Sequence, residues 1–157
     1  MVPAKVVVGK DVDMADQMEA LRGSCMCGAC KFTATPKAPE AHVCHCGMCR
    51  KWSGGMFIST DCGSSVRFDD GAPVGSYKGS EWGERLFCTA CGSTLLWQMQ
   101  SGEMQNVSIQ CFDDPGQFTL VSQIYIDRKP GCYALAGETK TMTEAEVVAL
   151  FAPETGA

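Results

Sequence analysis

Three clusters of cysteine constrain this sequence more than any other feature. The middle cluster, Cys44-His45-Cys46-Gly47-Met48-Cys49, places three thiols within six residues. Cys25-Met26-Cys27 precedes it, and Cys88-Thr89-Ala90-Cys91 follows it. A structural zinc site is closed by four protein ligands, whereas a catalytic site commonly has three and keeps one position open. The candidate ligands divide into four and three, so the sequence predicts two zinc ions per chain, one in a closed site and one in an open site.

The third cluster is typical of half a zinc knuckle. The glycine that follows Cys91 permits a backbone reversal after the second cysteine, so that both sulfurs face one point. The nearest spare pair is Cys25 and Cys27, and joining this pair to the third cluster would fix the start of the domain to its middle. We therefore predict a structural zinc held by Cys25, Cys27, Cys88 and Cys91, and a catalytic zinc held by Cys44, Cys46 and Cys49.

Other partitions stay open at this point. Cys30 completes a C-x-C-G-x-C pattern at 25–30 that repeats at 44–49, so the first cluster could combine with a residue of the second. A thiol-bridged metal cluster is a further alternative, although such clusters need a higher density of cysteine. Free cysteine behaves as a small hydrophobe and is often buried. We expect that structural role for the remaining cysteines, which are Cys30, Cys62, Cys111 and Cys132.

The eleven cysteines also bear on the compartment. Eleven is odd, so the thiols cannot all pair internally. The early apolar run Val6-Val7-Val8 is too short for a secretory signal, and Asp11 and Asp13 follow it. A cysteine-rich chain without a signal is more often metal-binding than disulfide-bonded, so we expect reduced thiols and a cytoplasmic location. The alternative is a disulfide-rich secreted domain whose signal has been removed.

The charge distribution argues against two classes of partner. The net charge is −5, the sequence pI is near 5.0, and lysine and arginine are scattered along the chain. A nucleic-acid-binding domain carries a basic patch, and a membrane-surface protein carries a polybasic segment. No stretch approaches the length of a transmembrane helix. We therefore expect neither nucleic acid nor a membrane as a partner, and the composition does not fix an oligomeric state.

The length of 157 residues suits one domain with a single core. We expect residues 1–20 to form an N-terminal extension and residues 21–157 to form the domain. Thr143 and Glu146 form a capping box before an apolar run that ends at Pro153, which predicts one C-terminal helix. The rest of the pattern indicates a mainly β fold. Short strand patterns separated by turns occur at 31–35, 56–60, 65–68, 74–77, 94–97, 106–109 and 118–126.

Three stretches around the cysteine clusters share their order and spacing with one known family. They are Gly23-Ser24-Cys25-Met26-Cys27-Gly28-Ala29, Cys44-His45-Cys46-Gly47-Met48-Cys49-Arg50 and Trp82-Gly83-Glu84-Arg85-Leu86-Phe87-Cys88-Thr89-Ala90-Cys91-Gly92. These stretches resemble the glutathione-dependent formaldehyde-activating enzyme (Gfa) family, also called the centromere protein V-like family. The resemblance runs from about Leu21 to the predicted C-terminal helix.

This resemblance implies a fold, a ligand set and an activity. The implied fold is the Mss4-like β-tent, in which two small antiparallel sheets are pinched together at a zinc. In the family, the first and third clusters hold a structural zinc and the middle cluster holds a catalytic zinc, in agreement with the partition above. The implied enzyme is a carbon–sulfur lyase similar to S-(hydroxymethyl)glutathione synthase, which joins formaldehyde and glutathione. Cys30 and Cys132 depart from the family pattern, which usually has an apolar residue and often a tryptophan at these two positions.

Few side chains are candidates to act beside an open zinc that binds a thiol or thiohemiacetal sulfur. Arg85 could bind a substrate carboxylate, and Glu84 beside it is a second candidate, although the two could equally form a surface pair. His45 lies between two ligands, and an extended segment would turn its side chain away from them. We expect His42 to be a structural or surface residue. Ser80 is a candidate hydrogen-bond donor.

Four aromatic residues are candidates for an apolar pocket wall. Most buried aromatic side chains belong to a core, so we expect no more than two of the four to line a site. The candidates are Trp52, Phe57, Trp82 and Trp97.

Two other functions compete with a lyase. A non-catalytic, zinc-stabilised β-tent binding module would not need an open zinc, so the three-cysteine cluster favours the enzyme. A reductase of oxidised sulfur would need a nucleophilic cysteine of low pKa with a resolving partner. Nothing in the sequence around Cys111 or Cys132 indicates such activation.

Overall fold

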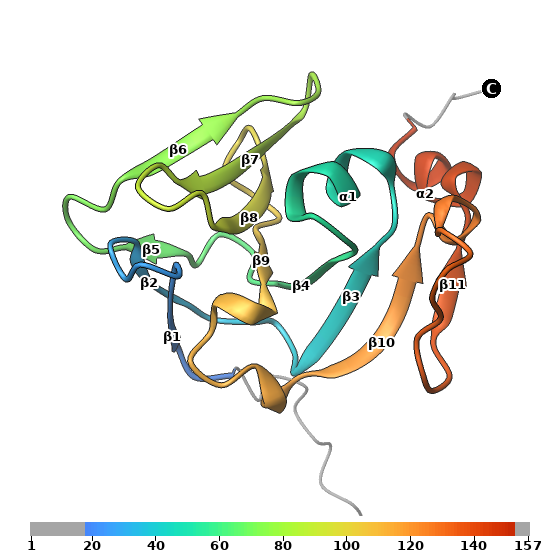
Figure 1. Cartoon of the computed structure of the whole chain (residues 1–157), viewed down its shortest axis with the longest axis horizontal. Helices are drawn as coiled ribbons and strands as arrows, with labels where there is room; N and C mark the ends of the chain where they lie inside the picture. Colours follow the sequence, from blue (N-terminus) through green and yellow to red (C-terminus); the bar gives the residue numbers. More distant parts are fainter. Residues whose placement is uncertain (1–17, 153–157) are drawn as a thin grey trace, which may run out of the picture.

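Short strands in two sheets dominate the computed structural model, which describes residues 18–152 (Figure 1). The smaller sheet has three strands in the order β1-β2-β5, which span Leu21–Ser24, Lys31–Ala34 and Arg67–Phe68. The larger sheet has eight strands in the order β11-β10-β3-β4-β9-β8-β7-β6. In that order these strands span Lys140–Met142, Thr119–Ile124, Glu40–Cys44, Phe57–Asp61, Asn106–Ser108, Thr94–Met99, Gly83–Cys88 and Val74–Tyr77. Most of the predicted N-terminal extension, residues 1–17, lies outside the described residues.

The helices are short. The α-helices are α1 (Gly47–Ser53) and α2 (Glu144–Phe151), and the 3₁₀ turns are η1 (Ile109–Cys111), η2 (Pro115–Gln117) and η3 (Ile126–Arg128). The predicted capping box is present at the start of α2, where Thr143 and Glu146 bond reciprocally. The prediction of a mainly β, two-sheet fold with a C-terminal helix is therefore confirmed. Within residues 18–152, no helix has the length and apolar character needed to cross a membrane.

The larger sheet contains parallel pairs that the sequence did not indicate. Strand β10 pairs in parallel with β3 on one side and with β11 on the other, whereas the remaining pairs are antiparallel. Figure 1 shows β3 and β10 running side by side toward the end of the molecule that carries α1 and α2. This pairing brings residues 119–124 next to residues 40–44, although the two segments are far apart in sequence.

The main core lies where the small sheet covers the middle of the large one. Phe32 of β2, Leu96 of β8 and Val107 of β9 are almost wholly buried and belong to one cluster. Phe32 also makes edge-to-face contacts with Phe68 and Phe112, at centroid distances of 5.8 and 5.6 Å. Aromatic pairs in this geometry stabilise a core beyond the area that they bury. The core thus joins the two sheets.

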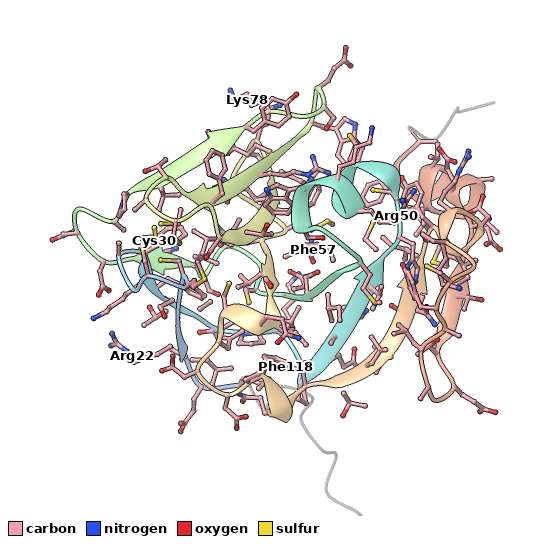
Figure 2. The ribbon with its side chains drawn as sticks, in the orientation of Figure 1. Arg22, Cys30, Arg50, Phe57, Lys78 and Phe118 are labelled. Atoms are coloured by element: carbon pink, nitrogen blue, oxygen red, sulfur yellow. The ribbon has the colours of Figure 1, made fainter. Side chains whose placement is uncertain are left out.

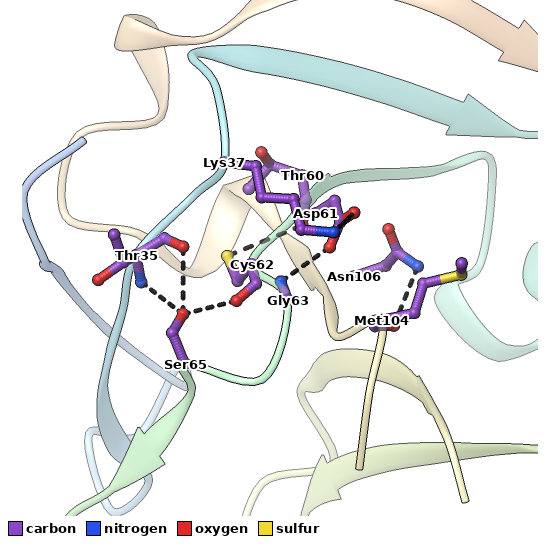
Figure 3. Close-up of polar contacts among 9 residues, drawn as sticks. All are labelled: Thr35, Lys37, Thr60, Asp61, Cys62, Gly63, Ser65, Met104 and Asn106. Carbon is purple, nitrogen blue, oxygen red and sulfur yellow. Dashed lines mark hydrogen bonds and ion pairs between the residues drawn. The ribbon is translucent and has the colours of Figure 1, made fainter. Parts of the chain in front are cut away.

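Cys62 belongs to a tight turn at the end of β4 (Figure 3). Its Sγ atom donates to the carbonyl oxygen of Thr60 at 3.8 Å, and its own carbonyl accepts from the hydroxyl of Ser65 at 2.6 Å. The Ser65 hydroxyl also accepts from the amide of Thr35, and Lys37 pairs with Asp61 at 2.7 Å. These contacts give Cys62 a packing role, as the sequence led us to expect.

Candidate metal centres

The first and third cysteine clusters meet in one place. The Sγ atoms of Cys25, Cys27, Cys88 and Cys91 all lie within 4.8 Å of one another. The distances are 3.5 Å between Cys25 and Cys27 and 3.9 Å between Cys27 and Cys88. Four sulfurs about 2.3 Å from a tetrahedral zinc lie about 3.8 Å apart. The type, number and spacing of these donor atoms therefore fit a closed zinc site. We call the four cysteines the closed cluster.

Local backbone structure aims these sulfurs at one point. Cys88 is the last residue of β7, and Gly92 follows Cys91 with a φ of 78°, a conformation that glycine adopts without strain. The amide of Gly92 donates to the carbonyl of Cys88 at 2.8 Å and closes the turn. Hydrogen bonds from the Ser93 hydroxyl and amide lower the pKa of the Cys91 thiol to about 5. A low thiol pKa favours the thiolate, which is the form that binds metal.

Cys30 lies beside the closed cluster without joining its four sulfurs. It is wholly buried, and it packs with Cys25, Cys88 and Leu95. Burial raises the pKa of its thiol to about 12, so the side chain is a neutral packing group. Its backbone amide donates to the sulfur of Cys25 at 3.2 Å and helps to orient that side chain.

The middle cluster forms a second site at the end of β3. Cys44 is the last residue of that strand, Cys46 caps the N-terminus of α1, and Cys49 lies in the first turn of α1. Their three sulfurs lie within 4.8 Å of one another. The amide of Cys49 donates to the sulfur of Cys46 at 3.4 Å. We call this three-sulfur arrangement the open cluster. Arg50 follows Cys49 in α1, and Figure 2 shows Arg50 well apart from Cys30, which lies between β1 and β2.

The three thiols of the open cluster are too close to ionise together without a cation between them. Hydrogen bonds with Cys44 and then Cys49 lower the pKa of the Cys46 thiol well below its ordinary value. The contacts of Cys44 with Cys46 and then Cys49 raise the pKa of the Cys44 thiol far above its ordinary value. A divalent ion removes this conflict, because each sulfur then bonds to the metal. The chemistry of the donor set therefore fits a soft divalent metal such as zinc.

His45 points away from the open cluster into a buried hydrogen-bond network. Its Nε2 atom lies 2.8 Å from Oε1 of Gln123, and its Nδ1 atom lies 3.1 Å from the hydroxyl of Tyr133. The Gln123 amide continues the chain to the hydroxyl of Thr139 at 2.8 Å. The side chain is wholly buried, so His45 supports the ligand loop from behind.

Arg85 is buried directly beside the open cluster. Its Nη2 atom donates to the sulfur of Cys49 at 3.8 Å, and its guanidinium lies 5.5 Å from the centre of the Trp52 ring. Its Nε atom is buried with no hydrogen-bond partner among the described residues. Glu84 lies on the other side of β7, where its carboxylate accepts from Gln98 at 2.7 Å. The structure therefore places Arg85 at the site and Glu84 outside it.

A cavity of about 300 Å³ opens beside the open cluster. Three of the four candidate aromatic residues, Phe57, Trp82 and Trp97, line it, so our limit of two was wrong. The limit failed because Phe57 of β4, Trp97 of β8 and Trp82, which directly precedes β7, border the same cavity. Trp52 lies outside the cavity lining and packs against Phe57 at 5.1 Å between ring centres. Ser80 lines the cavity and accepts from the amide of Gly83.

Several lining residues carry no signal that the sequence analysis used. His42 lines the cavity and pairs with Ser122, with 2.7 Å between Nδ1 and Oγ, although we expected a structural or surface residue. Met104 and Tyr125 also line it, and both have a positive φ, 49° and 55°. Among non-glycine residues this conformation is uncommon and is concentrated at functional sites. The pairing of β3 with β10, which no local pattern predicted, places His42 and Tyr125 at one site.

One close contact sets the position of the cavity wall. A Cβ atom on Gly83 would lie only 2.7 Å from the indole ring of Trp97. Glycine at this position therefore allows Trp97 to lie flat against β7 and to meet Trp82 edge to face, at 5.8 Å between ring centres.

Comparison with known proteins connects this geometry to a family. The model of the family described as glutathione-dependent formaldehyde-activating enzyme matches residues 20–128. The chain belongs to this family. Both cysteine clusters and Arg85 fall within the matched residues, whereas β11 and α2 follow them.

One curated relative and one solved structure extend the comparison of this Gfa family chain. A Schizosaccharomyces pombe protein named as an uncharacterized lyase is 32% identical over 132 residues, which cover 83% of this chain and 96% of the relative. A solved crystal structure of a Rhodobacter sphaeroides protein superimposes with a TM-score of 0.54 at 23% identity, covering 64% of this chain and 100% of that chain. The second likeness shows a shared fold.

Proposed function

We propose that the chain is a zinc-dependent carbon–sulfur lyase that forms or cleaves the adduct of a small thiol and an aldehyde. S-(hydroxymethyl)glutathione is the reference adduct, because the family takes its name from glutathione and formaldehyde. The name of the yeast relative supports a lyase. The observation that carries the proposal is the three-sulfur cluster beside a cavity, in a domain that already has a separate four-sulfur cluster.

The reaction that fits this site is an addition and its reverse. A zinc ion held by Cys44, Cys46 and Cys49 would supply a Lewis acid that lowers the pKa of a substrate thiol. In the forward direction the substrate sulfur forms a bond to the aldehyde carbon, and the thiol proton ends on the new hydroxyl oxygen. In reverse, the carbon–sulfur bond breaks and the proton returns to sulfur. No oxidant or reductant is required.

Arg85 is the residue that we assign to the substrate oxygen. Negative charge develops on the aldehyde oxygen as sulfur attacks, and a donor fixed in a buried site stabilises such charge strongly. The guanidinium is held by Cys49 and Trp52, and Arg85 lines the cavity. We propose that a guanidinium N–H donates a hydrogen bond to this oxygen.

The remaining members of the site position the reacting groups. Gln123 and Tyr133 hold His45, and the fixed His45 backbone orients the loop between Cys44 and Cys46. The thiols must stay reduced to bind metal, so we propose that the chain acts in a reducing compartment such as the cytoplasm.

Exchange NMR on a mixture of glutathione and formaldehyde tests the function. The rate of interconversion between free thiol and adduct is measured with no protein, with the zinc-loaded chain, and with a zinc-loaded Cys46→Ser variant. We expect the chain to accelerate exchange and the variant to lose the acceleration. The variant must keep the zinc of the closed cluster, so that its loss of activity is assigned to the open one.

Absence of acceleration with two zinc ions bound would refute the formaldehyde–glutathione reaction. The exchange rate is then measured with a panel of other thiols and aldehydes. A lyase that acts on a different substrate accelerates exchange for at least one pair, whereas a zinc-stabilised binding module accelerates none.

A further inference from the structure

The surface of the cavity beside the open cluster is mainly apolar, although polar side chains also line it. Three methionines, Met48, Met104 and Met142, come from three separate parts of the chain and line it together. Methionine side chains adapt to apolar ligands of different shape. Trp82 adds a wall by meeting Trp97 edge to face and by stacking on Phe151, at 5.6 Å between ring centres.

The polar side chains of the lining are mostly uncharged. Arg85 is the one permanently charged side chain among the described lining residues, and its guanidinium already contacts Cys49 and Trp52. His42 is paired with Ser122. A carboxylate brought into this cavity would lose its hydration, and the one cation of the described lining, Arg85, already contacts Cys49 and is assigned above to the reacting oxygen. Burying a carboxylate there is therefore costly. Glutathione carries two carboxylates and an ammonium group, so its charged ends do not suit this lining.

The apolar wall on one side comes from α2. Val147, Leu150 and Phe151 all line the cavity. Val147 is 5% exposed, whereas Leu150 and Phe151 are 69% and 46% exposed, which places these two at the rim. The helix is held at its start, where the carboxylate of Asp127 accepts from the amide of Glu144 at 2.8 Å and Arg128 pairs with Glu144. The family match ends at residue 128, before α2 begins. This wall therefore lies outside the family match, where substrate choice is free to differ from the family's.

We propose that the adduct handled at the open cluster has a neutral, apolar group on its sulfur, such as an alkyl or aryl group, and that α2 selects this group against charged thiols. The inference rests on the proposed function for the identity of the reacting sulfur. It concerns the part of the substrate that does not react. The volume of about 300 Å³ is at the small end for ligand sites, and it suits one aromatic or short alkyl group with its sulfur.

Equilibrium binding of unreactive thioethers tests the inference without catalysis. The zinc-loaded full chain is titrated with benzyl methyl sulfide and with S-methylglutathione, and binding is followed by tryptophan fluorescence, since Trp82 and Trp97 line the cavity. We expect benzyl methyl sulfide to bind at least about tenfold more tightly. Equal or tighter binding of S-methylglutathione would overturn the inference, even if the chain accelerates exchange with glutathione.

A pair of lysine substitutions on α2 tests the role of the helix. Phe151→Lys removes the ring that stacks on Trp82 and places a cation at the rim, so we expect the preference to fall by about tenfold or to reverse. Ala149→Lys adds the same charge at an exposed position outside the cavity lining and serves as the matched control. Leu150→Lys, at the more exposed rim residue, is the second variant should Phe151→Lys fold poorly. An unchanged preference in a folded rim variant would exclude α2 as the selecting element.

The two proposals fail separately. Preferential binding of benzyl methyl sulfide together with no exchange for any thiol would support the apolar site and refute the lyase. Accelerated exchange without an apolar preference would support the lyase and refute the apolar site.

Discussion

The guanidinium of Arg85 lies 3.8 Å from the sulfur of Cys49, although the two residues are 36 positions apart in the sequence. Strand β7 brings the arginine to the first turn of α1, where it is 4% exposed. Three thiolates and one divalent zinc carry a formal charge of −1. The buried guanidinium therefore balances the charge of the open cluster, and this pairing leads to the first prediction.

Arg85→Ala should weaken zinc binding at the open cluster and leave the closed cluster unchanged. Removing a partner of a metal ligand typically costs about 10–100-fold in metal affinity or activity. Competition with a chromogenic chelator measures the affinity of each of the two sites. Glu84→Gln is the matched control on the opposite face of the same strand, since Glu84 contacts Gln98 outside the cavity. An equal loss in both variants would contradict the assignment.

The two cysteine clusters should differ in what their loss does to the fold. Cys88→Ser removes a wholly buried member of the closed cluster, so we expect zinc content to fall by one ion and the melting temperature to fall by about 10–20 °C. Cys46→Ser removes a partly exposed member of the open cluster and should cost one zinc with a much smaller change in melting temperature. Calorimetry with metal analysis distinguishes them, and equal melting temperatures would show that the closed cluster is not structural.

The network behind the open cluster should stabilise both the fold and the ligand loop. His45→Ala leaves the side-chain oxygen of the buried Gln123 without its partner, which costs about 1–3 kcal/mol in free energy of unfolding. Tyr133→Phe removes one hydrogen bond and should cost less, about 1 kcal/mol. Urea denaturation measures both free energies. If His45→Ala leaves the zinc affinity of the open cluster unchanged, the network does not position the ligands.

The cysteines outside the two clusters should differ in reactivity. Burial raises the pKa of Cys62 to about 12 and that of Cys111 to about 11, so at pH 8 these thiols are overwhelmingly protonated and react slowly. Cys132 is exposed. Iodoacetamide added to the zinc-loaded protein at pH 8 should label Cys132 first, and Cys62 and Cys111 only after unfolding. Peptide mass mapping gives the order of labelling. Early labelling of Cys111 would instead favour the alternative function, a reductase of oxidised sulfur.

Local signals in the sequence were sufficient for the cysteine partition and for the C-terminal helix. Glycine after Cys91 and the capping box of Thr143 and Glu146 act over a few residues, and the structure contains both. Helix α1 was not predicted, because it has seven residues and begins with Gly47, a poor helix former. Cys46 caps it through its sulfur, a role that sequence patterns seldom assign to cysteine.

The cavity could not be predicted, because its walls come from distant segments. His42 meets Ser122 only because β3 and β10 pair in parallel, and Phe151 at the end of α2 meets Trp82 across 69 positions of sequence. Neither contact leaves a periodic pattern in the sequence. Arg85 was identified from its place before the third cluster, but its contact with Cys49 depends on the same long-range packing.

The parallel pairing of β3 with β10 also sets the order in which a newly synthesised chain can mature. All four sulfurs of the closed cluster have been made once Cys91 leaves the ribosome, and folding of a nascent chain starts from its N-terminal part. The open cluster has its three sulfurs earlier, but β10 beside it and Tyr133 behind it are made much later. A nascent chain can therefore complete its structural centre first, and it finishes the reactive centre only when synthesis is nearly over.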